Sequence, residues 1–388
     1  MPSTNVSLPL AGITVVELSD NASAPFAGFI LAGLGAQVWK VERPGKGDSA
    51  RGWGPSQWKG SSGTYHALNR GKKSICLDIK NPEQLEQLRK LIVDHADVFL
   101  HNLRPGSCGK YGLDAETLRS QSGRLIHCDV GAFGNAGPLR DLPGYDPLMQ
   151  AFSGIMSITG EEGQAPVRAG VSIVDFGTGM WAVIGIVCSL FRRERLGGGA
   201  TVNTSLLETA ISWMSAGIAN YAADGHEGGR HGSGVAFIVP HRTYQTSDGY
   251  LAVSCANDQL FSRLCAALGS PQWAEDSEFA TNAARLRNRE TVDQMIEAKL
   301  VQHPRAYWQD ALNQAGIACA PVQTTAEIYH HEQTKALHIL AKPSEDEIAL
   351  VGLPLSFDGT RPPPLHAVHE TGQDNEELDM RLNPALNN

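Results

Sequence analysis

The feature that most constrains the fold of this chain is a strand–helix–strand pattern over residues 12–42. Residues 12–18 are mostly apolar and β-branched, as a strand that is buried on both faces requires. A helix follows, with Pro25 in its first turn and apolar residues over 26–34, and a second strand covers 37–42. Because such a unit closes through a right-handed crossover, it predicts two parallel neighbouring strands.

The same alternation continues along the chain. Further strands are expected at 74–79, 97–101, 124–129 and 201–204. Strands that alternate with helices are typical of a parallel α/β sheet. The glycine-rich stretch 224–234 interrupts this pattern, and the chain beyond it is more helical. We therefore expect a large α/β domain over 1–223 and a smaller α+β domain over 224–330.

Composition narrows the class of protein. The 388 residues carry a net charge of −9 without a block of like charges, which argues against binding to nucleic acid or to a membrane surface. The seven cysteines are scattered and form no C-x-x-C pair, so a cytoplasmic location is expected. Residues 1–6 show no signal peptide pattern, and the longest apolar run, near 180–191, is expected to be too short to span a bilayer.

Several nucleotide-binding and metal-binding motifs are absent from the sequence. The turn after the first strand, residues 19–25, lacks the G-x-G-x-x-G pattern of NAD sites. No P-loop, G-x-S-x-G or H-E-x-x-H motif is present. His330 and His331 are neighbours without further ligands nearby, so no metal site is predicted.

Asp175 is the first candidate for chemistry. Gly177 and Gly179 follow it, and an apolar run over 180–191 predicts a buried helix that begins after them. A carboxylate at a helix N-terminus is stabilised by unpaired N–H groups and the helix dipole, and glycines leave room for a ligand near the backbone. From this stretch alone, a simple N-cap is the favoured interpretation of the aspartate.

Basic residues gather in three expected loops. They are Lys40 and Arg43, then Arg70, Lys72 and Lys73, then Arg104 and Lys110. Ligands of parallel α/β sheets bind beyond the carboxyl ends of the strands, so converging basic loops would suit a polyphosphate ligand. Solvated loop charges are the alternative interpretation.

An ordered set of short motifs resembles the class III CoA-transferase family, which also contains 2-methylacyl-CoA racemases. The motifs span most of the chain. They are Leu10-Ala-Gly-Ile-Thr-Val-Val-Glu-Leu, residues 31–42, Gly47-Asp48, Asn69-Arg-Gly-Lys-Lys-Ser-Ile, Asn102-Leu-Arg-Pro-Gly, Gly144-Tyr-Asp, Asp175 with Gly177 and Gly179, and Ala320-Pro-Val.

The resemblance implies a fold, a cofactor and roles for residues. The fold would be a large Rossmann-like domain, completed by a return of residues 331–388, plus a small domain, in an interlocked homodimer. Coenzyme A or acyl-CoA would be the substrate, and Asp175 the covalent nucleophile. Tyr145 and Asp146 would line the active site. The remaining residues implied in CoA binding are Arg43, Lys72, Lys73, Asn102, Arg104, Lys110, Gly177 and Gly179.

Transferase and racemase can be weighed at Tyr145. Racemases of the family are expected to use a histidine there, as half of an acid–base pair that moves an α-proton between faces. Tyrosine side chains ordinarily titrate near pH ~10 and are poor bases at neutral pH, so the sequence favours the transferase. Within the family, the resemblance implies that formyl-CoA:oxalate transferases carry a glutamine where this chain has Ala22. They also carry a run of glycines, which residues 228–234 match only loosely, so oxalate specificity is doubtful.

The sequence therefore predicts CoA transfer from an acyl-CoA, with succinyl-CoA as one possible donor, to a small carboxylic or dicarboxylic acid. An aspartyl-CoA thioester would be the intermediate. A racemase and a catalytically silent CoA-binding protein stay open as alternatives. A second carboxylate of the acid could be held by basic residues, although solvation or packing at the dimer interface is the favoured interpretation of these residues. They are Arg168, Arg230, His231 and His241.

Overall fold

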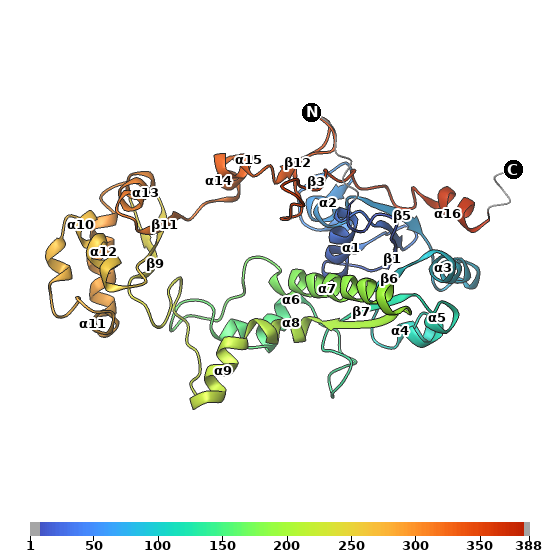
Figure 1. The fold of residues 1–388 in the computed structure, drawn as a ribbon, viewed down its shortest axis with the longest axis horizontal. Helices are drawn as coiled ribbons and strands as arrows, with labels where there is room; N and C mark the ends of the chain where they lie inside the picture. The colour runs from blue at the N-terminus through green and yellow to red at the C-terminus, as the bar shows by residue number, and fades with distance from the viewer. Residues whose placement is uncertain (1–7, 384–388) are drawn as a thin grey trace. The chain divides into compact units, whose positions relative to one another are not determined.

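The computed structural model describes residues 8–383, which form two compact units (Figure 1). Among the described residues, unit 1 holds the chain up to Gly154, the segment Ala169–Ala216 and the chain from Gln333 on. Unit 2 holds Ile155–Arg168 and Gly217–Glu332. The N-terminal segment that lacks a signal peptide pattern lies outside the described residues.

A six-stranded parallel sheet forms the centre of unit 1, which confirms the predicted α/β class. Its strands are β1 (Thr14–Leu18), β2 (Gln37–Glu42), β5 (Lys72–Cys76), β6 (Val98–His101), β7 (Ile126–Gly131) and β8 (Ala200–Ser205). They lie in the order β5-β2-β1-β6-β7-β8. This is the strand order of doubly wound nucleotide-binding folds, in which the order reverses beside the first strand.

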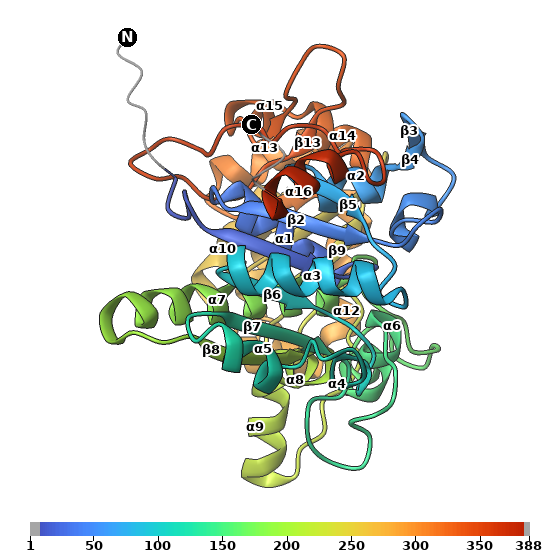
Figure 2. The same cartoon turned by 90° about the vertical axis from the view of Figure 1, so that its right-hand side faces the viewer.

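Helices cover both faces of this sheet (Figure 2). Val15 of β1 packs in one apolar cluster with Ala27 and Ile186, and the next residue, Val16, packs in another with Leu88 and Leu91. Successive side chains point to opposite faces of a strand, so both faces are buried and β1 is apolar throughout. The helices of unit 1 are α1 (Ser23–Gly33), α2 (Gly63–Asn69), α3 (Pro82–His95), α4 (Ser107–Tyr111), α5 (Ala115–Gln121), α6 (Asp146–Phe152), α7 (Ile173–Leu196), α8 (Leu206–Trp213) and α16 (Asn375–Leu382).

Helix α7 differs from its sequence expectation in its start and its length. It begins at Ile173, so Gly177 and Gly179 lie inside the helix and not in a turn before it. A Cβ atom on Gly179 would lie 2.6 Å from the Ser23 carbonyl oxygen, which shows how closely α1 and α7 approach. The expected run over 180–191 was too short to span a membrane, whereas the whole helix is long and apolar enough to do so.

Unit 2 is built around a three-stranded antiparallel sheet in the order β11-β10-β9. The strands are β9 (His241–Gln245), β10 (Tyr250–Ser254) and β11 (Ala318–Pro321). Its core joins buried strand residues such as Leu251 and Val253 to Phe261 and Leu264 of a helix. The helices of this part are α9 (Ser215–Asp224), which begins in unit 1, α10 (Asp258–Ala267), α11 (Asn282–Arg287), α12 (Arg289–Leu300), α13 (Arg305–Gln314) and α14 (Thr325–His330).

Short elements complete the chain. Two small antiparallel pairs lie in unit 1. They are β3 (Gln57–Trp58) with β4 (Ser61–Ser62), and β12 (Leu340–Ala341) with β13 (Leu350–Val351). Helix α15 (Glu332–Ala336) joins the end of unit 2 to unit 1. The 3₁₀ turns are η1 (Ser49–Gly52), η2 (Ile155–Ser157) and η3 (Pro271–Ala274).

Charged side chains from the neighbouring strands β1, β2 and β5 and from the loop after β2 are buried inside unit 1. Lys40 Nζ lies 3.0 Å from Glu17 Oε1 and 2.8 Å from Asp48 Oδ2, and Lys72 Nζ lies 2.8 Å from Glu17 Oε2. All four side chains are at most 3% exposed. Each charge therefore depends on its partners, because water does not reach them. We call Glu17, Lys40, Asp48 and Lys72 the buried charge cluster.

Replacing Lys40 by methionine tests this dependence. The substitution leaves Glu17 and Asp48 buried with one cation fewer, so we expect the free energy of unfolding to fall by about 3–5 kcal/mol. Urea unfolding followed by circular dichroism measures the change. The control is Arg124→Met, since Arg124 and Glu194 form an ion pair that is mostly exposed. Its loss should cost at most about 1 kcal/mol. Equal effects of the two substitutions would contradict the structural role of Lys40.

Candidate active site

The strand order places the expected ligand crevice of unit 1 between the carboxyl ends of β1 and β6. Asn102, directly after β6, links the two loops there. Its Oδ1 accepts the N–H of Asp20 at 3.0 Å, and its Nδ2 donates to the Asp20 carbonyl oxygen at 2.7 Å. The predicted ligand residue Asn102 therefore holds the loop after β1 in place at the reversal point of the sheet.

Asp20 is a site residue that the sequence analysis did not single out. Its carboxylate accepts hydrogen bonds from Arg43 Nη2 at 2.7 Å and from the backbone N–H of Ser49 at 2.8 Å. The pKa of Asp20 is raised, mainly because the carboxyl is partly removed from water and secondarily because Asp48 lies nearby. The signal in the sequence was an aspartate in the polar turn directly after a buried strand. Asp20 thus joins the loops that follow β1, β2 and β6.

Asp175 lies in the first turn of α7, at the same edge of the sheet. The neighbouring Phe176 packs on Phe26 in the first turn of α1, with ring centroids 4.7 Å apart. Because α1 follows the carboxyl end of β1, this contact places the start of α7 beside the loop that Asn102 holds. The nucleophile candidate and the reversal point of the sheet therefore belong to one edge of unit 1.

Asp146 organises the start of α7. This carboxylate is 1% exposed, and its Oδ2 accepts the backbone N–H groups of Val174 at 2.8 Å and Asp175 at 3.2 Å. Gln150 Nε2 donates to the other carboxylate oxygen. Asp146 thus caps a helix that begins far along the chain, and it satisfies two of the N–H groups that a helix start leaves open.

The electrostatic environment of Asp175 is unusual for a carboxylate. Burial raises its pKa to about 7, and the nearby charge of Asp146 adds to the rise. The group is therefore protonated in acid and becomes an anion as the pH rises through neutrality. Tyr145, the middle residue of the Gly144-Tyr-Asp motif, is 56% exposed and stands just before α6.

Gly177 and Gly179 serve the packing of α7 in this structure. Added Cβ atoms would lie 2.7 Å from the Trp213 ring at Gly177 and 2.6 Å from the Ser23 carbonyl oxygen at Gly179. Both glycines lie beyond the first four residues of the helix, where backbone N–H groups bond within the helix itself. Close approach of α8 and α1 therefore explains these glycines without a ligand.

The predicted basic residues divide into two groups. Arg43, Arg104 and Lys110 are exposed and follow β2 and β6 at the carboxyl edge. Lys72 and Lys73 are the first residues of β5, so their positions lie at the opposite, amino end of the sheet. The expected convergence of all three basic loops at one edge is therefore wrong for these two lysines.

Both lysines of β5 already have partners. Lys72 Nζ bonds to Glu17, to the Pro25 carbonyl oxygen and to Asn69 within the buried charge cluster, where burial lowers its pKa to about 8. Lys73 on the opposite face pairs with Glu377. The sequence did not reveal the charged partners, Glu17 and Glu377, because they come from distant parts of the chain.

The basic candidates for a second carboxylate lie in unit 2. Arg230 and His231 line a cavity of about 300 Å³ within that unit, together with Arg242. Arg242 pairs with Asp293 at 3.2 Å, and His241 Nδ1 lies 2.7 Å from the Ser254 hydroxyl. Arg168 belongs to the same unit but does not line this cavity.

The fold is a doubly wound α/β sheet with Asp175 at its carboxyl edge, where ligands of such folds are expected. Comparison with known proteins makes the class specific. The model of CoA-transferase family III matches residues 10–375, so the chain belongs to that family. It is a class III CoA-transferase, an enzyme that moves coenzyme A between acids.

Individual relatives agree with this assignment. The chain is 37% identical over 334 residues to a succinate–glutarate CoA-transferase of Agrobacterium fabrum, which covers 84% of this chain and 83% of that protein. It is 36% identical over 329 residues to a succinyl-CoA–D-citramalate CoA-transferase of Chloroflexus aurantiacus, covering 84% and 82%. A crystal structure of a CAIB/BAIF family protein from Brucella suis matches with a TM-score of 0.90 and 34% identity, covering 97% of this chain and 100% of that chain.

The substitution Asp146→Asn tests the origin of the Asp175 pKa. It removes the neighbouring charge but keeps an oxygen that can accept the α7 N–H groups, so we expect the pKa to fall below about 7 while burial keeps it above 3.8. Carboxyl chemical shifts of ¹³C-labelled aspartate, followed against pH, measure the change. The exposed carboxylate of Asp141 gives the control, Asp141→Asn. An unchanged Asp175 titration in the Asp146 variant would show that burial alone sets the pKa.

Proposed function

We propose that this enzyme transfers CoA from succinyl-CoA to a small dicarboxylic acid through covalent intermediates on Asp175. The observation that carries the proposal is the placement of Asp175. This partly buried carboxylate stands in the first turn of a helix, at the edge of the sheet where nucleotide ligands bind. A carboxylate withdrawn from water is a stronger nucleophile than a solvated one, and neighbouring N–H dipoles orient it.

The reaction proceeds by exchange of acyl and thiolate groups on Asp175. The anionic carboxylate attacks the donor thioester, which forms a mixed anhydride and releases CoA thiolate. The thiolate attacks the aspartyl carbonyl, so that an aspartyl-CoA thioester forms and succinate leaves. The acceptor carboxylate then attacks this thioester to give a new anhydride and thiolate. Thiolate attack on the acceptor acyl carbon yields the product and restores the Asp175 carboxylate.

Residues around Asp175 have supporting roles in this proposal. Asp146 positions the nucleophile through its two hydrogen bonds to the start of α7. Arg43, Arg104 and Lys110 are exposed at the carboxyl edge and would contact the phosphates of CoA. Binding energy at the nucleotide end then holds the thioester in position for attack. Lys72 and Lys73 have structural partners and are left out of this phosphate site.

The substrates are proposed from the relatives. The two similar transferases named above act on glutarate and on D-citramalate, with succinate or succinyl-CoA as the exchange partner. These acids carry two carboxylates, of which one exchanges CoA and the other must be bound.

The family also contains racemases, and the structure offers little support for that chemistry. A racemase needs two acid–base groups on opposite sides of the α-carbon. The group beside Asp146 is Tyr145, which is largely exposed and makes no cap hydrogen bond at its helix. Exchange of the α-proton in heavy water distinguishes this alternative, because CoA transfer breaks no bond at the α-carbon.

Replacing Asp175 by alanine tests the nucleophile. We expect loss of CoA exchange between succinyl-CoA and glutarate with retention of the fold, because the side chain sits at a helix start and is partly exposed. After incubation with succinyl-CoA and then hydroxylamine, mass spectrometry should find a hydroxamate on Asp175 in the enzyme without the substitution and none in the variant. The control Asp141→Ala removes an exposed carboxylate and should keep both signals. Full exchange activity in the Asp175 variant would refute the mechanism.

Pairing of two copies in the cytoplasm is part of the same proposal. Helix α7 exposes apolar side chains at helical spacing along one side. They are Met180, Trp181, Ile184, Val187 and Phe191, each at least 36% exposed. A contiguous exposed apolar stripe of this kind marks a contact surface, and a second copy that covers it would give a homodimer.

Charged substitutions on α7 test this pairing. We expect Ile184→Glu combined with Phe191→Glu to convert a dimer into monomers, because a buried glutamate without a partner opposes association. Light scattering coupled to size-exclusion chromatography measures the mass. Met380→Glu places the same charge on another exposed apolar residue of unit 1, in α16, and should leave the mass unchanged. A double α7 variant that remains dimeric would place the interface elsewhere.

A further inference from the structure

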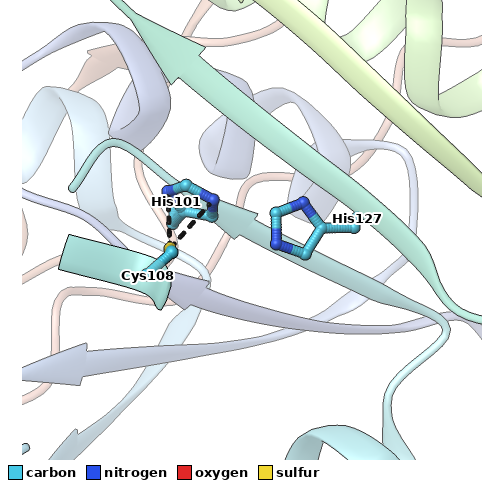
Figure 3. Close-up of side chains that lie close together, drawn as sticks. All are labelled: His101, Cys108 and His127. Carbon is cyan, nitrogen blue, oxygen red and sulfur yellow. Dashed lines mark hydrogen bonds between the residues drawn. The ribbon is translucent and has the colours of Figure 1, made fainter. Parts of the chain in front are cut away.

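Three potential metal ligands meet beside the sheet of unit 1, apart from Asp175 (Figure 3). His101 is the last residue of β6, His127 belongs to β7, and Cys108 belongs to α4, which follows the loop after β6. One ligand atom from each side chain lies within 4.8 Å of the others. Both histidines are at most 3% exposed.

The sheet register explains why these side chains meet. In the parallel pair, Phe99 lies beside His127 and His101 lies beside Asp129. Alternate residues of a strand share a face, so His101, His127 and Asp129 all project on the same side. The ring centroids of His101 and His127 are 4.9 Å apart. Helix α4 brings Cys108 onto this face.

His127 has the hydrogen-bond pattern of a metal ligand. Its Nε2 lies 3.0 Å from the carbonyl oxygen of Leu113 and donates to it, which leaves Nδ1 without a proton. Nδ1 is buried and has no hydrogen-bond partner among the described residues. A histidine that ligates a metal commonly donates its other ring N–H to a carbonyl or carboxylate in this way. An unpaired buried nitrogen costs stability unless something binds it.

His101 and Cys108 complete the arrangement. Cys108 Sγ lies 3.4 Å from His101 Nε2, close to the separation of roughly 3.5 Å between ligand atoms of a tetrahedral zinc ion. His101 Nδ1 lies 3.7 Å from the same sulfur, accepts the backbone N–H of Leu103 at 3.4 Å, and lies 3.7 Å from Asp129 Oδ1. A carboxylate there can orient the ring and offset the positive charge of a metal–thiolate unit.

We propose that His101, Cys108 and His127 bind a divalent transition metal ion of the zinc class, with the Asp129 carboxylate beside His101. Thiolate and imidazole ligands favour such ions over magnesium or calcium. On binding, Cys108 releases its proton to solvent and its sulfur binds the ion. Both histidines bind as neutral imidazoles, so a single proton leaves per ion.

The consequence of the ion would be structural. It would tie β6, β7 and α4 together directly beneath the loop in which Asn102 holds Asp20. Metal binding would therefore stabilise the folded chain and the carboxyl edge of its sheet. The proposal does not depend on the substrates of the transferase. The sequence did not predict this site, because its ligands lie in no recognised metal-binding spacing.

Cobalt(II) titration of the full, untagged chain after treatment with a chelator tests the site. We expect a sulfur-to-cobalt charge-transfer band that saturates at a single ion per chain, and a higher melting temperature with zinc. Cys108→Ser should abolish the band, and Asp129→Asn should weaken cobalt binding by about 10–100-fold. Proton release on zinc binding, measured with a pH indicator in weak buffer, should disappear in the Cys108 variant.

A control variant and a folding check distinguish loss of the metal site from loss of the fold. Cys188→Ser removes an exposed cysteine of α7 and should leave the band, the stoichiometry and the melting shift unchanged. Circular dichroism of each metal-free variant checks that it is folded before titration. A band that survives in folded Cys108→Ser, or that is lost in Cys188→Ser, would overturn the proposal. So would the absence of any band in the unmodified chain.

Discussion

The buried charge cluster is the interaction on which the ligand-binding edge of unit 1 depends. Lys40 and Glu17 come from the adjacent strands β2 and β1, and Asp48 comes from the loop that follows β2. The second oxygen of Asp48 accepts the backbone N–H groups of Asn21 at 3.2 Å and Ala50 at 2.8 Å. Lys40 and these hydrogen bonds hold the pKa of Asp48 at about 2, despite the opposing effect of burial. The Asp48 carboxylate thus holds both the loop after β1 and the loop after β2 in place.

Between the buried charge cluster and the surface, further hydrogen bonds hold the loops in position. Asp20 connects the loop after β1 to Arg43 and Ser49, and Asn102 connects it to β6. Asp146 performs the corresponding task for α7, whose first N–H groups it accepts. Carboxylates and amides, together with the Phe26–Phe176 contact, therefore set the positions of the loops around the candidate nucleophile. This choice suits an edge that must remain open to a charged and solvated ligand.

The sequence predicted much of the fold because the signals were local. The apolar runs identified the strands, and the alternation with helices identified a parallel sheet, which the structure confirms. The start of α7 was misplaced, because Asp146 caps it from another helix and no local pattern shows that contact. Lys72 and Lys73 were assigned to the wrong edge for a different reason. The expected strand at 74–79 began directly after them, and the start of a strand in a parallel sheet lies at the amino end, where β5 places both lysines.

Gly179 has a consequence for how this enzyme can move. With no side chain between them, α1 and α7 touch backbone to backbone near Ser23, so sliding one helix past the other would bring main-chain atoms into collision. The start of α7 and the loop after β1 should therefore behave as one rigid body during a catalytic cycle. Any opening that admits an acyl-CoA must then come from segments outside this pair of helices. In amide hydrogen exchange, the contact region would be among the last parts of unit 1 to open.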